Sequence, residues 1–178
     1  MRDDGSVPRG AHVGLVLHEP EIPNNTGTIG RLCVAMGFCL HLIHPAGFSV
    51  TDRALRRSGL DYWPRLRVAE HANWASYRRA VRPERVWLLC AHGTRPIFEA
   101  GIRPGDQFVL GSETRGLPEA MIDEDPSRCL TIPMVEGERS LNLAVAAGIA
   151  CGEAVRQLVS GGALESDALG RLREPVDG

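Results

Sequence analysis

Short apolar runs alternate with helical patterns along most of the chain. Six runs are strand candidates, and several of them are nearly continuous in apolar residues, as is typical of strands buried on both faces. These runs span residues 12–17, 39–44, 66–69, 85–91, 107–111 and 129–133. Strands that alternate with helices favour an α/β fold with a mostly parallel six-stranded sheet and helices on both faces.

Helix signals lie between these runs. The first helix is expected to begin near Asn24 or Asn25, either of which could cap it, and to end at Gly37. The last is expected from about Ser140, its candidate cap, to residue 159. It carries a stripe of small and apolar residues at helical spacing, which permits close packing against the sheet or a partner chain. Further helices are expected over residues 51–58 and 73–81 and from residue 118.

The two ends of the chain differ from the middle. Residues 1–10 are polar with Gly and Pro, and the sequence turns small and charged from residue 161. We therefore expect flexible tails at 1–10 and 161–178 around a single domain at 11–160. No apolar run seen in the sequence is long enough to cross a bilayer, so no membrane partner is expected. Five cysteines without a C-x-x-C pair indicate reduced thiols in a cytoplasmic protein.

Charge is distributed unevenly, although the net charge of −2 does not by itself indicate a nucleic-acid partner. All 20 basic residues are arginine, which excludes mechanisms that need a phosphate-binding or Schiff-base lysine. From Asp52 to Arg85, nine arginines face four acids. Arginine suits bidentate phosphate contacts, but a solvated surface explains the same run.

Common nucleotide and metal motifs are missing from the sequence. No G-x-G-x-x-G follows the first apolar run, and there is no H-E-x-x-H, no G-x-S-x-G and no zinc-ligand spacing. The sequence therefore predicts neither a Rossmann dinucleotide site nor a metal site.

Three unusual segments follow predicted strands, where ligands collect in parallel α/β sheets. Residues 19–27 form a proline-stiffened loop that opens a helix, with Arg31 one turn inside it. Residues 108–118 place Gly111, which permits close backbone approach, just before the carboxylate of Glu113. Residues 131–143 end in Ser140 and Asn142, which offer a hydroxyl and an amide at a helix opening. An ordinary loop or helix cap explains each segment taken alone.

Together these segments resemble the three motifs of the SpoU branch of the SPOUT RNA methyltransferases. The first motif corresponds to residues 24–31, the second to 110–117 and the third to 132–143, in the family's order and over about residues 12–160. A narrower resemblance is to the single-domain TrmL-type tRNA (cytidine/uridine-34)-2′-O-methyltransferases. It is carried by residues 19–23, 47–48, 55–62, 113–118 and 139–142.

The resemblance implies a SPOUT fold with a C-terminal deep trefoil knot and a cytoplasmic homodimer. It implies transfer of a methyl group from S-adenosyl-L-methionine, which leaves S-adenosyl-L-homocysteine, to the wobble ribose in the anticodon stem-loop of a tRNA, without a metal. The residues that it assigns to the cofactor are Leu89, Gly93, Gly111, Ile132, Met134, Ser140 and Leu141.

The catalytic residues implied by the resemblance are Arg31, Glu113, Ser140 and Asn142. Because a guanidinium stays protonated, we expect Arg31 to stabilise a developing alkoxide or to hold a phosphate. Glu113 is the alternative base, or it orients Arg31 or a backbone group. The candidate RNA contacts are Asn25, Arg53, Arg56, Arg57, Tyr62, Arg115 and Arg139, with Tyr62 either stacking on a base or belonging to the core.

Two departures from the family pattern leave the substrate open. Ala144 stands where a serine is usual, and Cys90, Ala91 and His92 form an altered turn before Gly93. Another tRNA or rRNA position, or an RNA-binding protein with weakened catalysis, therefore remains an alternative.

Overall fold

A seven-stranded sheet forms the centre of the protein, in a computed structural model that describes residues 13–49 and 60–173. The strands lie in the order β3-β2-β1-β6-β4-β7-β5, and all neighbouring pairs are parallel. They are β1 (Val13–His18), β2 (Cys39–Ile43), β3 (Val68–His71), β4 (Val86–Leu89), β5 (Arg95–Pro96), β6 (Asp106–Leu110) and β7 (Cys129–Thr131).

The six predicted strands are confirmed as β1, β2, β3, β4, β6 and β7, but the predicted number of strands is wrong. The additional strand, β5, pairs with β7 at the edge of the sheet. It has two residues, Arg95 and Pro96. So short a segment, with a proline in it, carries no periodic signal in the sequence.

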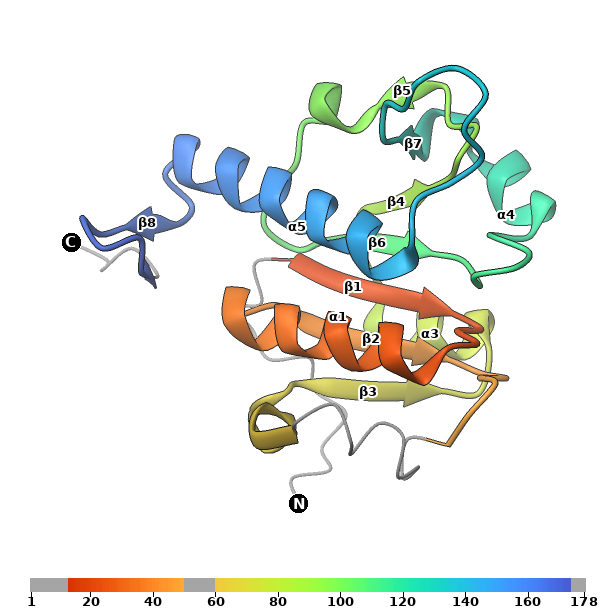
Figure 1. The fold of residues 1–178 in the computed structure, drawn as a ribbon, viewed down its shortest axis with the longest axis horizontal. Helices are drawn as coiled ribbons and strands as arrows, with labels where there is room; N and C mark the ends of the chain where they lie inside the picture. The colour runs from red at the N-terminus through yellow and green to blue at the C-terminus, as the bar shows by residue number, and fades with distance from the viewer. Residues whose placement is uncertain (1–12, 50–59, 174–178) are drawn as a thin grey trace.

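Helices cover both faces of the sheet, as predicted (Figure 1). On one face α1 (Pro23–Met36) and α5 (Leu143–Ser160) pack on a core that includes Leu15 and Phe108. On the other, α3 (Trp74–Val81) and α4 (Glu119–Glu124) pack on a core that includes Val16 and Val109. Leu15 and Val16 serve opposite cores because successive side chains of a strand point to opposite faces. Short 3-10 helices are η1 (Leu60–Arg65), η2 (Ile97–Glu99) and η3 (Pro126–Arg128). The helix expected over 51–58 lies outside the described residues.

The helix ends show which sequence signals were misread. Neither Asn24 nor Asn25 caps α1, which has Ile22 at its N-cap and ends at Gly37 in the left-handed conformation. Ser140 does not cap α5. Asn142 does so instead, because it directly precedes the helix and its Oδ1 accepts hydrogen bonds from the amides of Ala144 and Val145.

The chain beyond α5 differs from the expected tail. Residues 161–173 fold back, and β8 (Glu165–Ser166) pairs with β9 (Leu172–Arg173) in an antiparallel hairpin. The turn places Leu164 in the core, where it is 3% exposed, and its amide donates to the carbonyl of Leu158. Composition alone did not predict that Leu164 packs on the core or that this hairpin forms. Residues 1–10 and 174–178 lie outside the described part of the chain.

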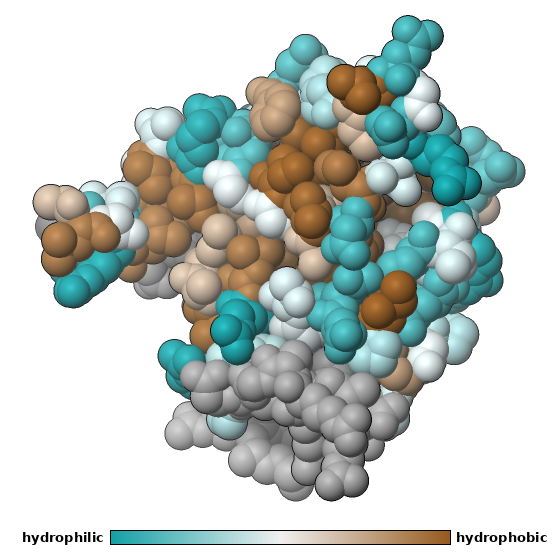
Figure 2. Space-filling model, viewed as in Figure 1, coloured by the Kyte–Doolittle hydropathy of each residue, from teal (hydrophilic) through white to brown (hydrophobic). Residues whose placement is uncertain are grey.

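Helix α5 is long and apolar enough to cross a membrane by length and composition, contrary to the expectation from the sequence. Its place in the fold accounts for this composition. Ala147, Ala150 and Ala154 are buried in the core, and Glu153 forms an ion pair with Arg156. Figure 2 shows further apolar side chains along the outer surface of the molecule where α5 lies. Val145 in this helix is exposed.

Candidate active site

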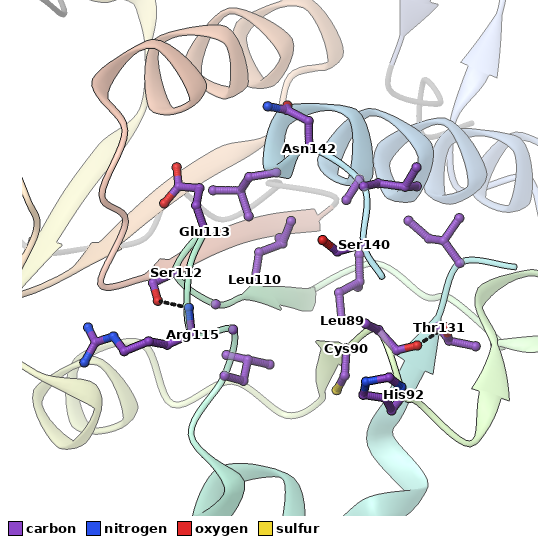
Figure 3. Close-up of a pocket in the computed structure, with 18 of the residues that line it drawn as sticks. Leu89, Cys90, His92, Leu110, Ser112, Glu113, Arg115, Thr131, Ser140 and Asn142 are labelled. Carbon is purple, nitrogen blue, oxygen red and sulfur yellow. Dashed lines mark hydrogen bonds between the residues drawn. The ribbon is translucent and has the colours of Figure 1, made fainter. Parts of the chain in front are cut away.

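A cavity of about 670 Å³ opens at the carboxyl ends of β4, β6 and β7. Its walls come from the segments that follow these strands and from residues 140–143 at the start of α5. Figure 3 shows Leu89, Leu110 and Ser140 facing this space, with Glu113 and Asn142 near one another at its rim. The volume is that of a small-molecule site.

Side-chain hydrogen bonds join the three predicted segments at the rim of the cavity. The side-chain nitrogen Nδ2 of Asn25 donates to Oε1 of Glu113 at 2.9 Å. The side-chain nitrogen Nδ2 of Asn142 donates to Oδ1 of Asn25 at 3.1 Å. Asn25 therefore uses both ends of its side chain to bridge the second and third motifs.

Glu113 also binds the backbone that leads into α1. Its Oε2 accepts a hydrogen bond from the amide of Glu21 at 2.8 Å, and its Oε1 accepts one from the amide of Ile22 at 3.3 Å. A carboxylate is favoured at this place because amides at a helix start lack helical partners and carry partial positive charge. With three N–H groups bound, Glu113 is better suited to orient α1 than to accept a proton from substrate.

Glu19 and Glu21 are site residues that sequence reasoning missed. Glu21 accepts hydrogen bonds from the amide and hydroxyl of Thr114, at 3.1 and 2.8 Å. Arg115, which lines the cavity, lies 3.0 Å from Glu19 and 3.8 Å from Glu21. The sequence did contain a signal for these contacts, namely the opposite charges of Glu19 and Glu21 in the loop before the first motif and of Arg115 in the second motif.

Two predicted glycines are explained by packing within the chain. A Cβ on Gly111 would lie 2.0 Å from the carbonyl carbon of Gly116, where the loop closes through paired backbone hydrogen bonds between Ser112 and Gly116. A Cβ on Gly93 would lie 2.5 Å from the carbonyl carbon of Leu130. Gly111 lines the cavity, whereas Gly93 supports β7 and does not line it.

The other predicted cofactor residues share one cavity. Leu89, Gly111, Ile132, Met134, Ser140 and Leu141 all line it. Cys90 and His92 line it as well, although neither was predicted as a site residue. Burial, together with the neighbouring Cys129, raises the pKa of the Cys90 thiol to about 12, so this thiol is protonated and unreactive at neutral pH.

Arg31 does not line the cavity. It is exposed on α1, with its guanidinium 5.1 Å from the centre of the Tyr62 ring. Tyr62 is 3% exposed, and its hydroxyl donates to the carbonyl of Gly27 at 2.6 Å, so the core alternative holds for this tyrosine. Arg139 is exposed and lies outside the cavity lining. Arg53, Arg56 and Arg57 lie outside the described residues. Among residues 13–49 and 60–173, no three His, Cys, Asp or Glu side chains are grouped to hold a metal.

Comparisons with known proteins identify the family of this chain. The SpoU rRNA methylase family matches residues 12–152. A tRNA (cytidine(34)-2′-O)-methyltransferase of Saccharophagus degradans is 47% identical over 145 residues, which cover 81% of this chain and 94% of that protein.

Solved structures extend the agreement to the fold. A structure that reports on the 2-OH methylation of C/U34 on tRNA has a TM-score of 0.80 and 43% identity, covering 85% of this chain and 99% of that one. The SpoU methyltransferase AviRb from Streptomyces viridochromogenes, in complex with the cofactor AdoMet, has a TM-score of 0.74 and 28% identity over 86% of this chain and 63% of that one. The chain therefore belongs to the SpoU methylase family.

Proposed function

We propose that this protein transfers a methyl group from S-adenosyl-L-methionine to the ribose 2′-hydroxyl of the wobble nucleotide, cytidine or uridine 34, of a tRNA. The observation that carries the proposal is the single cavity in which Gly111 and Ser140 from two motifs meet, joined to the first motif through Asn25. The names of the related proteins supply the acceptor, nucleotide 34.

The cavity fits the cofactor in size and lining. Leu89, Ile132 and Leu141 provide apolar walls for an adenine ring, and the Ser140 hydroxyl and backbone groups provide polar contacts. When bound, S-adenosylmethionine supplies an electrophilic methyl group on a sulfonium. The residues of the cavity would hold the donor so that an acceptor oxygen can approach in line, which removes much of the entropic barrier. S-adenosyl-L-homocysteine would leave as the product, and no step requires a metal.

The roles of the polar residues follow from their contacts. Asn142 and Glu113 hold Asn25 between them, so we assign these three residues to orientation of the acceptor side of the site. Arg31 is assigned to the alkoxide that develops on the acceptor oxygen or to an adjacent phosphate. Arg115 and Arg139 are exposed and are assigned to phosphate contacts at the rim, together with Arg53, Arg56 and Arg57 from the segment that the structure leaves undescribed.

A homodimer is part of the proposal. Arg31 lies six residues after Asn25, roughly 9 Å further along α1, and outside the cavity of its own chain. A second copy could present its Arg31 to this cavity. Leu141, just before α5, and Val145, within α5, are exposed apolar side chains and provide a face for such a partner. The family's deep trefoil knot and a cytoplasmic location belong to the same proposal.

The test is to incubate the purified protein with unmodified tRNA and S-adenosylmethionine and to map the product by mass spectrometry. One added methyl group on the ribose of nucleotide 34 is expected. Methylation of another nucleotide would show that the enzyme acts at a different position of the tRNA. Failure of the protein to bind S-adenosylmethionine in calorimetry would indicate an RNA-binding protein without catalysis.

A further inference from the structure

The loop after β1 and the loop after β6 are joined by two carboxylates, and each carboxylate accepts hydrogen bonds from the other loop. Glu113, in the loop after β6, accepts hydrogen bonds from the amides of Glu21 and Ile22 at 2.8 and 3.3 Å. Glu21, in the loop after β1, accepts hydrogen bonds from the amide and hydroxyl of Thr114 at 3.1 and 2.8 Å. We call this arrangement of Glu21, Ile22, Glu113 and Thr114 the carboxylate clasp.

The carboxylate clasp lies between the two halves of the site. On one side the loop from Gly111 to Gly116 forms a wall of the cavity. On the other side begins α1, which carries Asn25 and Arg31 and has no side-chain cap of its own. Hydrogen bonds to a carboxylate are shorter and stronger than neutral ones, and bonds made in both directions restrict rotation as well as separation. The orientation of α1 against the cavity wall therefore depends on the clasp.

Arg115 contributes charge to the carboxylate clasp. It lies 3.0 Å from Glu19 and 3.8 Å from Glu21, where it offsets the repulsion between neighbouring carboxylates. Its side chain is 69% exposed, so solvent and salt screen this attraction. The hydrogen bonds between Glu21 and Thr114 consequently matter more to the clasp than the ion pair does.

We propose that Glu21 is a positioning residue for methyl transfer, which acts through Thr114 and Glu113 to hold α1 and its Arg31 in place against the cavity wall. Glu21 does not itself line the cavity. The inference rests on the proposed function. It predicts that loss of Glu21 lowers kcat, while the affinity for S-adenosylmethionine changes little because the walls from Leu89, Ile132 and Leu141 stay intact.

Four variants separate the hydrogen bonds from the charge. Glu21→Ala removes both, and kcat is expected to fall about tenfold or more, since small misplacements of reacting groups are costly. Glu21→Gln keeps one oxygen that can accept from Thr114 and is expected to retain much of kcat. Thr114→Val removes one of the two bonds and is expected to fall between wild type and Glu21→Ala. Glu84→Gln is the matched control, because Glu84 is exposed and precedes the amino end of β4, whereas the site lies beyond the carboxyl ends of the strands.

The experiment measures three quantities for each variant: kcat and KM for tRNA, the Kd for S-adenosylmethionine by calorimetry, and amide hydrogen exchange at Thr114 and Glu21 by NMR. Glu21→Ala is expected to lose kcat, to keep its cofactor Kd within about threefold and to exchange faster at Thr114. A kcat within twofold of wild type in a folded Glu21→Ala protein overturns the proposal. Parallel loss of cofactor binding and kcat also overturns it, because Glu21 would then support the cavity itself.

Failure of the proposed function gives a different result. A wild-type protein that binds S-adenosylmethionine but methylates no tRNA refutes the proposed function. Exchange at Thr114 in Glu21→Ala then still decides whether Glu21 holds the two loops together. If Glu21→Ala does not fold, Thr114→Val takes its place, because it removes the hydrogen bond between the Thr114 hydroxyl and Glu21. A lowered kcat with an unchanged cofactor Kd is then expected, and a wild-type kcat in the folded variant overturns the proposal.

Discussion

Asn142 donates a hydrogen bond from its side-chain nitrogen to Oδ1 of Asn25 at 3.1 Å, across 117 residues of sequence. The side-chain oxygen of the same Asn142 accepts hydrogen bonds from the first amides of α5. One side chain therefore sets the start of α5 and ties it to α1, so its two functions can be separated by mutation.

Replacing Asn142 by Ala removes the helix cap and the bridge to Asn25 together. We expect the free energy of unfolding to fall by about 1 kcal/mol, the usual cost of a lost cap, and methyl transfer to fall as well. Asn142→Asp keeps an oxygen that can cap the helix but lacks the donor to Asn25. It is expected to unfold in urea close to wild type and to lose activity. Full activity in Asn142→Asp would show that the bridge is dispensable.

Gly111→Ala is expected to deform the cavity wall. Its Cβ would lie 2.0 Å from the backbone of Gly116, so the loop must move, and we expect a loss of about 2 kcal/mol or more in unfolding free energy. Cofactor affinity should fall with it. Gly101→Ala is the control, since no atom lies within 4 Å of the added Cβ. Wild-type cofactor binding by Gly111→Ala in calorimetry would contradict the claim that a side chain at position 111 deforms the wall of the cavity.

A buried histidine pair predicts that acid destabilises the protein. Nδ1 of His41 lies 3.0 Å from Nε2 of His71, and burial together with His71 lowers the pKa of His41 from 6.5 to about 4. The unfolded chain therefore binds protons at a higher pH than the folded protein. The stability that the neutral His41 contributes is complete above about pH 6.5 and is lost as the pH falls toward 4. Burial also lowers the pKa of His71 and of His18, which adds to the effect.

The expected slope from His41 is up to about 1.4 kcal/mol per pH unit in this window. Urea unfolding from pH 7.5 to pH 4.5 measures it. His41→Gln can keep a hydrogen bond to His71 but does not titrate, so its stability should depend less steeply on pH. An unchanged slope in that variant would assign the acid sensitivity to other groups.

Arg31→Ala is expected to separate catalysis from cofactor binding. Because Arg31 lies outside the cavity lining, the Kd for S-adenosylmethionine should stay at the wild-type value. The rate should fall about 100-fold or more, as it does when a charge-stabilising donor is removed. Arg31→Lys keeps the charge but not the planar fork and should recover only part of the rate. Loss of cofactor binding in Arg31→Ala would give the residue a structural role instead.

Local patterns in the sequence predicted most of the fold. Continuous apolar residues, such as Leu15 to Leu17 in β1, mark strands that are buried on both faces, and helices on both sides follow from their alternation with helical segments. β5 was not predicted, because a strand of two residues shows no alternation of apolar and polar positions. The cap of α5 was assigned to Ser140 rather than Asn142, because both residues suit a cap and local sequence alone does not fix where the first turn begins.

The sequence predicted the three segments that form the site, but not the hydrogen bonds that join them. The contacts of Asn25 with Glu113 and with Asn142 were not predicted, since the sequence suggested Asn25 only as an RNA contact. The pairing of Glu21 with Thr114 depends on how two loops 93 residues apart face each other, which no local pattern contains. Burial of Tyr62 beneath Arg31 is likewise a consequence of tertiary packing, and its aromatic ring suited RNA stacking and the core equally well.

The most direct test of the account compares two anticodon stem-loops that differ in one atom. One carries ribose at nucleotide 34 and the other carries 2′-deoxyribose there, and both are incubated with the protein and methyl-labelled S-adenosylmethionine. We predict that label enters the ribose stem-loop and not the deoxyribose one. Equal labelling of both stem-loops, or of neither while the protein binds the cofactor, would contradict methyl transfer to the 2′-hydroxyl of nucleotide 34.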